Sequence, residues 1–284
     1  MQLYAYDKEE QLISAQQAHK HTDYFCLECK SIVRLRSGPH RQRHFYHTAP
    51  TPQCRQHQKG ATHIYLQHYL QQKLTLSDAR LEWPFPQIGR IADVAWLSKK
   101  IVFEIQYSHI NAQELLARNS DYARLGWQVI WIFHDFRYNQ RRLTAAEMAV
   151  RNSPHYFSNM EPQKGGIIYD QFDLCENGIR KHKLPQLELQ FDNLNPRYLP
   201  KNILWPLISN KERLQSWSLS LKGDMASLVM DNTQTEYLQQ AKALEMAHLR
   251  SISSQNRSIF AKLFQDAHKI YQTIFRYILE KHCR

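Results

Sequence analysis

The sequence has no aspartate or glutamate between Lys30 and Ser77. Lysine and arginine occupy eight positions of the same stretch: Lys30, Arg34, Arg36, Arg41, Arg43, Arg55, Lys59 and Lys73. Such a surface binds a phosphate backbone by releasing counterions, with an affinity that falls steeply with salt and carries little base-sequence information. Because the whole chain also has a formal net charge of +11 at pH 7, we expect an anionic partner, with nucleic acid favoured.

The sequence also lacks a long hydrophobic run. The longest apolar stretches, such as Val129 to Phe133, are far shorter than the roughly 20 residues of a membrane-spanning helix. The N-terminus has no charged segment followed by a long apolar one, as a secretory signal would. We therefore expect a cytoplasmic protein with no membrane contact, and its 284 residues are enough for two or more structural units.

Cysteine is scarce and unevenly placed, which argues against a disulfide framework. The chain has five cysteines, an odd number, and two of them form a Cys-x-x-Cys pair near histidines. Cys26 and Cys29 can place two thiolates on one zinc ion, and His44 with His47 can complete a tetrahedral site. Four protein ligands would make the site structural rather than catalytic. Alternatively, Cys54 and His57 could replace the histidine pair.

Aromatic residues lie among the basic ones and leave two interpretations open. They could stack on unpaired bases, or they could pack in the core. The residues concerned are Phe45, Tyr46, Tyr65 and Tyr69.

Two apolar segments carry the polar residues that point to chemistry. Asp93 lies in the first, and Glu104 and Gln106 share one face of the second if it is a strand. The polar turn from Ser98 to Lys100 would fold the segments into a hairpin, with Asp93 beside Glu104. Two carboxylates would then converge where a hard divalent cation such as Mg²⁺ could bind.

The neighbouring periodicities predict a mixed α and β domain. A helix is expected from about Gly60 to Leu76, and a second helix is expected to begin at Asn111, with Glu114 three residues on, and to end at Gly126. Strands are expected at Leu81 to Phe85, Arg90 to Leu97, Ile101 to Tyr107 and Gln128 to Phe133, after a short hairpin of Gln2 to Asp7 with Gln11 to Ala15.

The order helix, three strands, helix, strand resembles the minimal core of the restriction-endonuclease-like nucleases. The metal site of that class is an Asp followed by Glu-x-Lys on the next strand, and Gln106 here replaces the Lys. The region resembles more narrowly the competence protein CoiA-like nucleases, which carry Glu-x-Gln followed by a Ser, here Ser108. The resemblance also covers Ala5, Asp7, Cys26-x-x-Cys29, His44-Phe45-Tyr46-His47, Arg118, Tyr122, Gly126 and the strand from Val129 to Ile132.

The resemblance implies a set of site residues. It favours Cys26, Cys29, His44 and His47 as the zinc ligands, and it implies Asp93 and Glu104, with the carbonyl of Ile105, as ligands of Mg²⁺ or Mn²⁺. Many members of the nuclease class also have an acidic residue on the first helix. This helix has none, and His63 resembles the family's histidine there, while Glu82 on the first strand is an alternative acid.

The remaining site residues follow from the expected mechanism. Gln106 would orient the attacking water or the phosphate, and Ser108 would bond backbone or phosphate. Because Gln106 carries no charge, a cation such as Lys99, Lys100 or Arg118 would have to stabilise the transition state. For nucleic-acid binding we expect the following residues: Arg34, Arg36, Arg41, Arg43, Lys99 and Arg118.

The rest of the chain is less informative. Residues 137–229 mix prolines and short apolar runs, with possible strands at Ile167 to Phe172 and Leu187 to Phe191. Residues 230–284 have apolar residues at helical intervals, which we interpret as two helices in a hairpin. The predicted units are a zinc-finger-like basic module at 1–59, a nuclease core at 60–136, a mixed extension at 137–229 and the helical hairpin at 230–284.

Two functions are compatible with all of these patterns, whereas a third, an RNA-binding zinc protein, fits the basic module but leaves Asp93 and Glu104 unexplained. The first is a metal-dependent DNA nuclease that acts on incoming DNA in natural transformation, as the resemblance implies, on single-stranded or branched DNA and alongside the strand-exchange recombinase. The second is a DNA-binding recombination factor that keeps the nuclease fold with a weak or inactive site. The absence of an acid on the first helix favours the second, whereas Asp93 and Glu104 favour the first.

Overall fold

The computed structural model of the chain describes residues 2–39, 41–49, 51–52, 54, 59–74, 78–191, 216, 219–231 and 235–282. The side chain of Arg41 lies outside the described part, as do Arg55 and His57 entirely. Among the described helices, none combines the length and the apolar character that a membrane crossing requires.

The N-terminal unit is a five-stranded sheet in the order β2-β1-β3-β4-β5. The strands are β1 (Tyr4–Tyr6), β2 (Leu12–Ser14), β3 (Tyr24–Phe25), β4 (Ile32–Gly38) and β5 (Arg41–His47). The expected N-terminal hairpin is confirmed, because β1 and β2 pair antiparallel. The small core of this unit contains Cys26 and Cys54 beside Val33 and Phe45.

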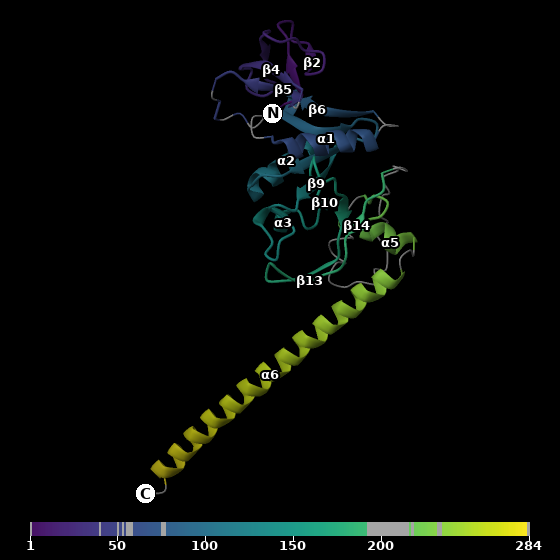
Figure 1. The fold of residues 1–284 in the computed structure, drawn as a ribbon. Coiled ribbons are helices and arrows are strands. Elements are labelled where there is room, and N and C mark those ends of the chain that lie inside the picture. Colours follow the sequence, from purple (N-terminus) through teal and green to yellow (C-terminus); the bar gives the residue numbers. More distant parts are fainter. Residues whose placement is uncertain are drawn as a thin grey trace.

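A second sheet of seven strands forms the centre of the molecule, in the order β14-β11-β10-β9-β8-β7-β6 (Figure 1). The strands nearest the site are β6 (Ala79–Phe85), β7 (Arg90–Trp96), β8 (Ile101–Gln106) and β9 (Gln128–His134). Strands β6, β7 and β8 pair antiparallel, whereas β8 and β9 pair parallel. Between β6 and β7, Pro86–Ile88 form a single 3-10 turn.

Two helices cover opposite faces of this sheet. Helix α1 (Ala61–Lys73) buries Ile64, Leu66 and Leu70 in the cluster that contains Val94 and Phe103. Helix α2 (Ala112–Arg124) buries apolar side chains in a separate cluster, on the face formed by the alternate residues of the same strands. The side chains of β8 therefore point alternately toward α1 and toward α2.

The expected element order is confirmed by the sequence α1, β6, β7, β8, α2, β9. The side chain of Asn111 caps α2 by accepting a 2.7 Å hydrogen bond from the backbone N–H of Glu114. Gly126 follows the helix with a φ of +76°, a left-handed conformation that favours glycine. Local capping signals in the sequence thus fix the position of α2 relative to β9.

The chain then extends the sheet and adds a small third unit. The elements are α3 (Ala145–Ala149), β10 (His155–Ser158), β11 (Ile168–Asp170), β12 (Asp173–Glu176), β13 (Ile179–Lys183), β14 (Leu187–Glu188) and α5 (Met225–Asp231). The strands expected near residues 167 and 187 are confirmed as β11 and β14. The hairpin of β12 and β13 packs near α5 through an apolar cluster that includes Phe172 and Met225.

The C-terminal region differs from our expectation. Residues Thr235–His282 form one helix, α6, of 48 residues, so the predicted helical hairpin is wrong. A rise of 1.5 Å per residue makes this helix about 72 Å long. Only its first turns pack on the body, through Leu238, Ala241 and Leu244, and the rest projects away (Figure 1).

Candidate functional site

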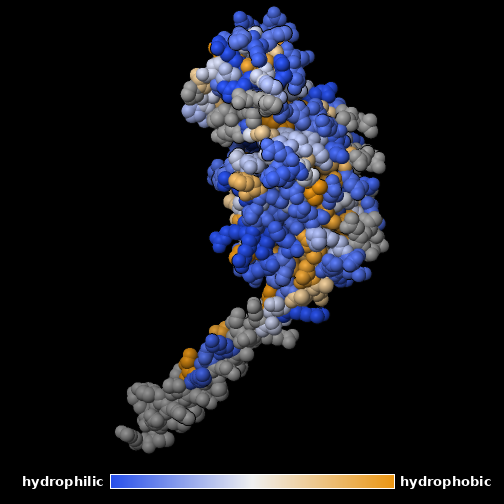
Figure 2. Space-filling view, viewed as in Figure 1, coloured by the Kyte–Doolittle hydropathy of each residue, from blue (hydrophilic) through white to orange (hydrophobic). Residues whose placement is uncertain are grey.

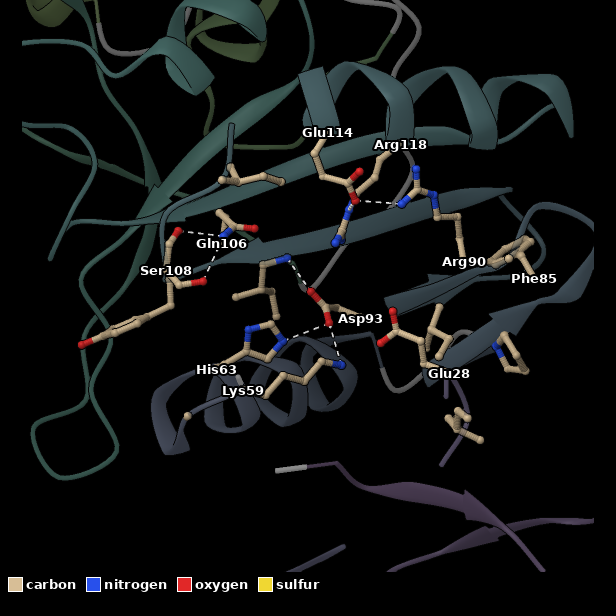
Figure 3. Close-up of a pocket in the computed structure, with 18 of the residues that line it drawn as sticks. Glu28, Lys59, His63, Phe85, Arg90, Asp93, Gln106, Ser108, Glu114 and Arg118 are labelled. Carbon is tan, nitrogen blue, oxygen red and sulfur yellow. Dashed lines mark hydrogen bonds and ion pairs between the residues drawn. The ribbon is translucent and has the colours of Figure 1, made fainter. Parts of the chain in front are cut away.

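A cleft of about 540 Å³ lies between the N-terminal sheet and the central sheet. The N-terminal unit contributes Glu28 and Lys30 to its lining, and the central unit contributes Lys59, His63 and Asp93. The end of β8 and the start of α2 complete the lining through Gln106, Ser108, Glu114 and Arg118 (Figure 3). The cleft therefore collects most of the residues that the sequence nominates for catalysis.

Asp93 lies where β7 and β8 separate. The two strands pair from Val94 to Trp96, and Asp93 is the first residue beyond this ladder. Its Oδ2 accepts a hydrogen bond of 2.9 Å from the backbone N–H of Ile105, in place of a strand-to-strand bond. The expected placement of Asp93 beside the Glu104 strand is thus confirmed. The carboxylate is held at the edge of the cleft by the backbone of β8.

Three donors meet the other oxygen of Asp93. His63 Nε2 lies 2.9 Å from Oδ1, Gln67 Nε2 lies 3.2 Å from it, and Lys59 Nζ lies 3.0 Å from it (Figure 3 draws the bonds of His63 and Lys59). Burial alone would raise the pKa of Asp93, but the charges of His63 and Lys59 outweigh burial and lower that pKa far below its ordinary value. Asp93 is therefore an ionised carboxylate at neutral pH.

Lys59 is a site residue that sequence reasoning placed only in the basic stretch. Its Nζ lies 3.1 Å from Glu82 Oε1 and 3.0 Å from Asp93 Oδ1, and its side chain is only 10% exposed. Burial opposes the charge of Lys59, but Glu82 and Asp93 outweigh it and raise the pKa above its usual value. The site thus contains a permanent buried cation that comes from the segment before α1 rather than from β8.

The position of Glu82 at the start of a strand suggests a carboxylate exposed to solvent, but the structure buries it. It has no exposed surface, and its Oε2 accepts hydrogen bonds from the backbone N–H groups of Leu3 (2.7 Å) and Tyr4 (3.0 Å). The φ of Glu82 is +45°, a left-handed conformation unusual for a side-chain-bearing strand residue. Glu82 therefore joins the N-terminal strand to Lys59.

Glu104 faces α2 and is held there by two donors. Arg118 Nη1 lies 2.7 Å from Oε2, and the Tyr122 hydroxyl donates to Oε1 at 2.8 Å. Burial raises the pKa of Glu104 and Asp93 adds to this effect, while Arg118 and Tyr122 oppose it. Because Glu104 is 1% exposed, it depends on Arg118 for its charge balance.

Arg118 lines the cleft, as expected of a residue nominated to contact a phosphate, and its role is now more specific. Arg118 also bonds Glu114 Oε1 through Nε at 3.0 Å. Burial opposes its charge, but Glu104 and Glu114 outweigh burial and raise its pKa. Because its guanidinium already bonds two carboxylates, Arg118 mainly positions Glu104 and Glu114. Only the part of the guanidinium that faces the cleft can still contact a phosphate.

Gln106 shares the α2-facing side of β8 with Glu104, as the strand alternation predicts. Its Nε2 donates to the Ser108 carbonyl at 2.7 Å and lies 3.3 Å from Ser108 Oγ (Figure 3). The Tyr138 hydroxyl donates to the same carbonyl at 2.7 Å. The amide nitrogen of Gln106 is thus directed along the rim of the cleft.

The basic stretch does not form one uniform surface. On β4, Arg34 and Arg36 are exposed, and they contact Asp23 (2.6 Å) and the Tyr46 ring (4.1 Å to its centroid) respectively. Arg43 is turned inward, where Nε and Nη2 donate to the carbonyls of Ala15 and Ala18. Hydrophilic side chains dominate the face of this unit in Figure 2. Lys99 lies in the turn at the far end of β8, outside the cleft lining.

The proposed base-stacking residues are mostly part of the core. Phe45 is completely buried, and Tyr65 and Tyr69 pack against the α1 cluster. Among the four, Tyr46 is half-buried beneath Arg36. The packing interpretation therefore holds for Phe45, which cannot contact a base.

A compact metal-ligand cluster lies in the N-terminal unit. Ligand atoms of Cys26, Cys29, His47 and Cys54 all lie within 4.8 Å of one another. Cys29 Sγ is 3.2 Å from His47 Nε2, and Cys26 Sγ is 3.6 Å from Cys54 Sγ. Three thiols and one imidazole match the ligands of a structural zinc site, so the donor set fits a metal such as zinc.

The prediction that His44 is a zinc ligand is wrong, because the position of His44 on strand β5 turns its side chain away from the cluster. His44 and His47 are three residues apart on β5, so that their side chains point to opposite faces of the sheet. The Nδ1 atom of His44 instead lies 2.8 Å from the carbonyl of Gln42. Cys54, named as an alternative, takes the fourth position, whereas His57 lies outside the described residues.

Comparisons with known proteins agree with these two units. The model of the competence protein CoiA N-terminal domain matches residues 6–57, which contain all four residues of the metal cluster. The model of the competence protein CoiA nuclease-like domain matches residues 54–176, which contain Lys59, His63, Asp93 and Glu104. No curated protein and no solved structure matched the chain. The two domain matches overlap at residues 54–57 and together cover residues 6–176, more than half of the chain, and the chain belongs to the competence protein CoiA family.

Proposed function

We propose that this protein is a metal-dependent DNA nuclease of the restriction-endonuclease-like class that processes incoming DNA in natural transformation. Family membership points to a competence-related function, and the matched domain is described as nuclease-like. The order of α1, β6, β7, β8, α2 and β9 is that expected of the class core. In this proposal the protein acts in the cytoplasm, its substrate is single-stranded or branched DNA, and its partner is the strand-exchange recombinase.

The observation that carries the proposal is the position of Lys59. The class uses a lysine two residues after the glutamate, and here that position is Gln106. Lys59 supplies the missing charge from another element, with its Nζ 3.0 Å from Asp93 Oδ1. A preorganised ammonium in a buried site stabilises the charge that develops on a phosphate during hydrolysis. The substitution at Gln106 therefore does not remove the cation from the site.

The carboxylates of Asp93 and Glu104, with the carbonyl of Ile105, would hold Mg²⁺ or Mn²⁺. Oxygen donors of this kind suit both ions. When bound, such an ion supplies Lewis acidity at a phosphate oxygen and lowers the pKa of an attacking water. His63 positions Asp93 through the 2.9 Å contact with Oδ1. Gln106 offers an amide at the rim of the cleft that can orient water or phosphate, as the sequence suggests.

A second function has its own observation. Arg118 and Tyr122 occupy both oxygens of Glu104, and Lys59, His63 and the Ile105 amide occupy those of Asp93. Carboxylates neutralised in this way have less tendency to bind a metal. A DNA-binding recombination factor with a weak or inactive site is the function that this arrangement favours.

One cleavage experiment separates the two. Labelled single-stranded, duplex and branched DNA would be incubated with the full chain and Mg²⁺ or Mn²⁺, with binding recorded in parallel. We expect metal-dependent cleavage that Glu104→Gln abolishes and Lys59→Met lowers by about 100-fold or more, since one stabilising donor is worth about that much. Lys164→Met is the matched control, because Lys164 is exposed, lies outside the cleft lining and is not among the residues expected to bind nucleic acid, and it should cleave normally.

The outcomes are distinct. Cleavage that survives in Glu104→Gln would refute the assigned site. Salt-sensitive binding without cleavage by any of the proteins would refute the nuclease and establish the DNA-binding factor.

A further inference from the structure

An aromatic pair with one exposed ring lies at the edge of the cleft and has no part in the mechanism above. The side chain of Phe136 is 68% exposed, more than any other large hydrophobic side chain of the described residues. It stacks on Tyr107, with ring centroids 5.4 Å apart and ring planes within 5° of parallel. One face of the Phe136 ring is thus covered by Tyr107, and the exposure leaves the other face open to solvent.

The fold explains why these two residues meet. Strands β8 and β9 are parallel neighbours, with Gln106 paired to Phe133 at their carboxyl ends. Tyr107 follows β8 directly, and Phe136 follows the end of β9 by two residues. Loops that leave the carboxyl ends of parallel strands emerge at one edge of the sheet, where ligands of such sheets commonly bind.

The pair is continuous with the candidate active site. Tyr107 lines the cleft together with its neighbours Gln106 and Ser108. Tyr107 also packs on the His134 ring, at 4.8 Å between centroids, which anchors the stack to β9. Arg137, the next residue in the turn, is also exposed. A strand of nucleic acid that enters the cleft at this end would pass the Phe136 ring beside Tyr107.

We propose that Phe136, supported by Tyr107, is a stacking site for one unpaired base, so that the cleft takes single-stranded DNA or the unpaired end of a branched molecule. The proposal rests on the proposed function, because it names the substrate class of the same site. An exposed ring with one free face accepts any base, and stacking of this kind is tolerant of sequence. A base inside a duplex is already stacked on both sides and cannot use it.

The test is binding rather than cleavage. The full chain would be titrated, without chelator or added Mg²⁺, against a fluorescent 12-nucleotide deoxythymidine strand and against a duplex of matched length. Phe136→Ala should weaken binding to the single strand by about fivefold to 100-fold, the usual effect of losing one stacked base, and should change duplex binding less than twofold. Phe136→Trp should retain single-strand affinity because it keeps an aromatic face.

Two further variants control for hydrophobicity and position. Phe136→Leu keeps an apolar side chain without a ring and should behave like Phe136→Ala. Met148→Ala removes another exposed hydrophobic side chain, 53% exposed on α3, and should bind like the wild type. A single strand that contains 2-aminopurine should show quenching with the wild type and Phe136→Trp but not with Phe136→Ala.

The results that overturn the proposal are specific. Unchanged single-strand affinity in Phe136→Ala, wild-type behaviour of Phe136→Leu, or an equal loss for single strand and duplex would each refute the stacking site. Failure of the proposed nuclease function would give a different result. The wild type would cut no DNA, yet Phe136→Ala would still show a selective loss of single-strand affinity.

Discussion

Cys54 sets the charge of the metal cluster as well as its geometry. With Cys26, Cys29 and His47 it gives three thiolates and one neutral imidazole, so that a bound Zn²⁺ would leave a formal charge of about −1. A cluster with two thiolates and two histidines would instead be neutral. The ligand set would therefore place a small negative charge inside a unit whose sequence is rich in arginine.

The ligand assignment predicts opposite effects at two positions. Cys54→Ser removes one of the four ligands, and zinc content should fall from about one ion per chain toward zero, with loss of the N-terminal unit's stability. His44→Gln should keep its zinc, because the side chain of His44 points to the other face of β5. Zinc measured by atomic emission on the two purified proteins checks this. Zinc retained in Cys54→Ser and lost in His44→Gln would restore the histidine pair as ligands.

At the residue scale, the sequence predicted those site residues that lie on regular elements. Strand alternation placed Glu104 and Gln106 together, and the polar turn placed Asp93 opposite them. Lys59 could not be found in this way, since it lies in a segment before α1, 34 positions from Asp93, and only the folded chain brings the two together. A single lysine in a basic stretch carries no signal that distinguishes a buried ion pair from solvated charge.

Helix α5 begins at a carboxyl group that titrates near neutrality. Asp224 is fully buried, and its side chain accepts hydrogen bonds from the backbone N–H of Ser227 (2.7 Å) and from the Tyr156 hydroxyl (2.8 Å). Burial, together with the charge of Asp170, raises the pKa of Asp224 to about 7. The start of α5 is therefore most stable when this carboxyl is protonated.

The raised pKa predicts a loss of stability with rising pH. The folded pKa is about 7 and the unfolded pKa is about 3.9, so the contribution is complete below about pH 4 and is lost as the pH rises through 7. Between pH 5 and pH 8 this group should lower the free energy of unfolding by about 3 kcal/mol. Asp224→Asn, which cannot ionise, should remove that part of the pH dependence, as denaturant unfolding at the two pH values would measure.

The matched control is on the same helix. Asp231→Asn replaces an exposed aspartate at the end of α5 and should leave the pH dependence as in the wild type. Equal pH dependence in wild type and Asp224→Asn would contradict the raised pKa. The measured quantity is the difference in the free energy of unfolding between pH 5 and pH 8, so any pH-independent cost of the substitution cancels.

Element by element, helices with caps were more predictable than helices without them. Asn111 and Gly126 fixed both ends of α2, whereas α6 has no internal glycine or proline that could mark a turn. The absence of glycine and proline predicts a helix, but it also removes the sequence signal for the position of a turn between two helices. The distinction between one helix and two depends on whether an apolar stripe finds a partner, which periodicity alone does not state.

At the scale of the whole molecule, Glu82 joins the N-terminal unit to the central unit. Its carboxylate accepts the amides of Leu3 and Tyr4 on one side and pairs with Lys59 on the other, without exposed surface. Leu3 also packs in the α1 cluster of the central unit. The N-terminal sheet is therefore attached through the same ion-pair network that holds Asp93, so that stability of the interface and geometry of the site are coupled.

This coupling predicts a large effect from a small change. Glu82→Gln leaves Lys59 without one buried partner and weakens the contact with the N-terminal amides, and it should lower the free energy of unfolding by about 3 kcal/mol. Glu161→Gln is the control, because it breaks another Glu–Lys pair whose side chains are 45% and 78% exposed. That exposed pair should contribute little to the free energy of unfolding, because water and salt screen it. Denaturant unfolding of both variants measures the difference, and zinc content should stay unchanged since Glu82 is not among the four ligands. If Glu82→Gln cost no more than Glu161→Gln, the two units would be held together by apolar packing alone, and the buried carboxylate would have no role in joining them.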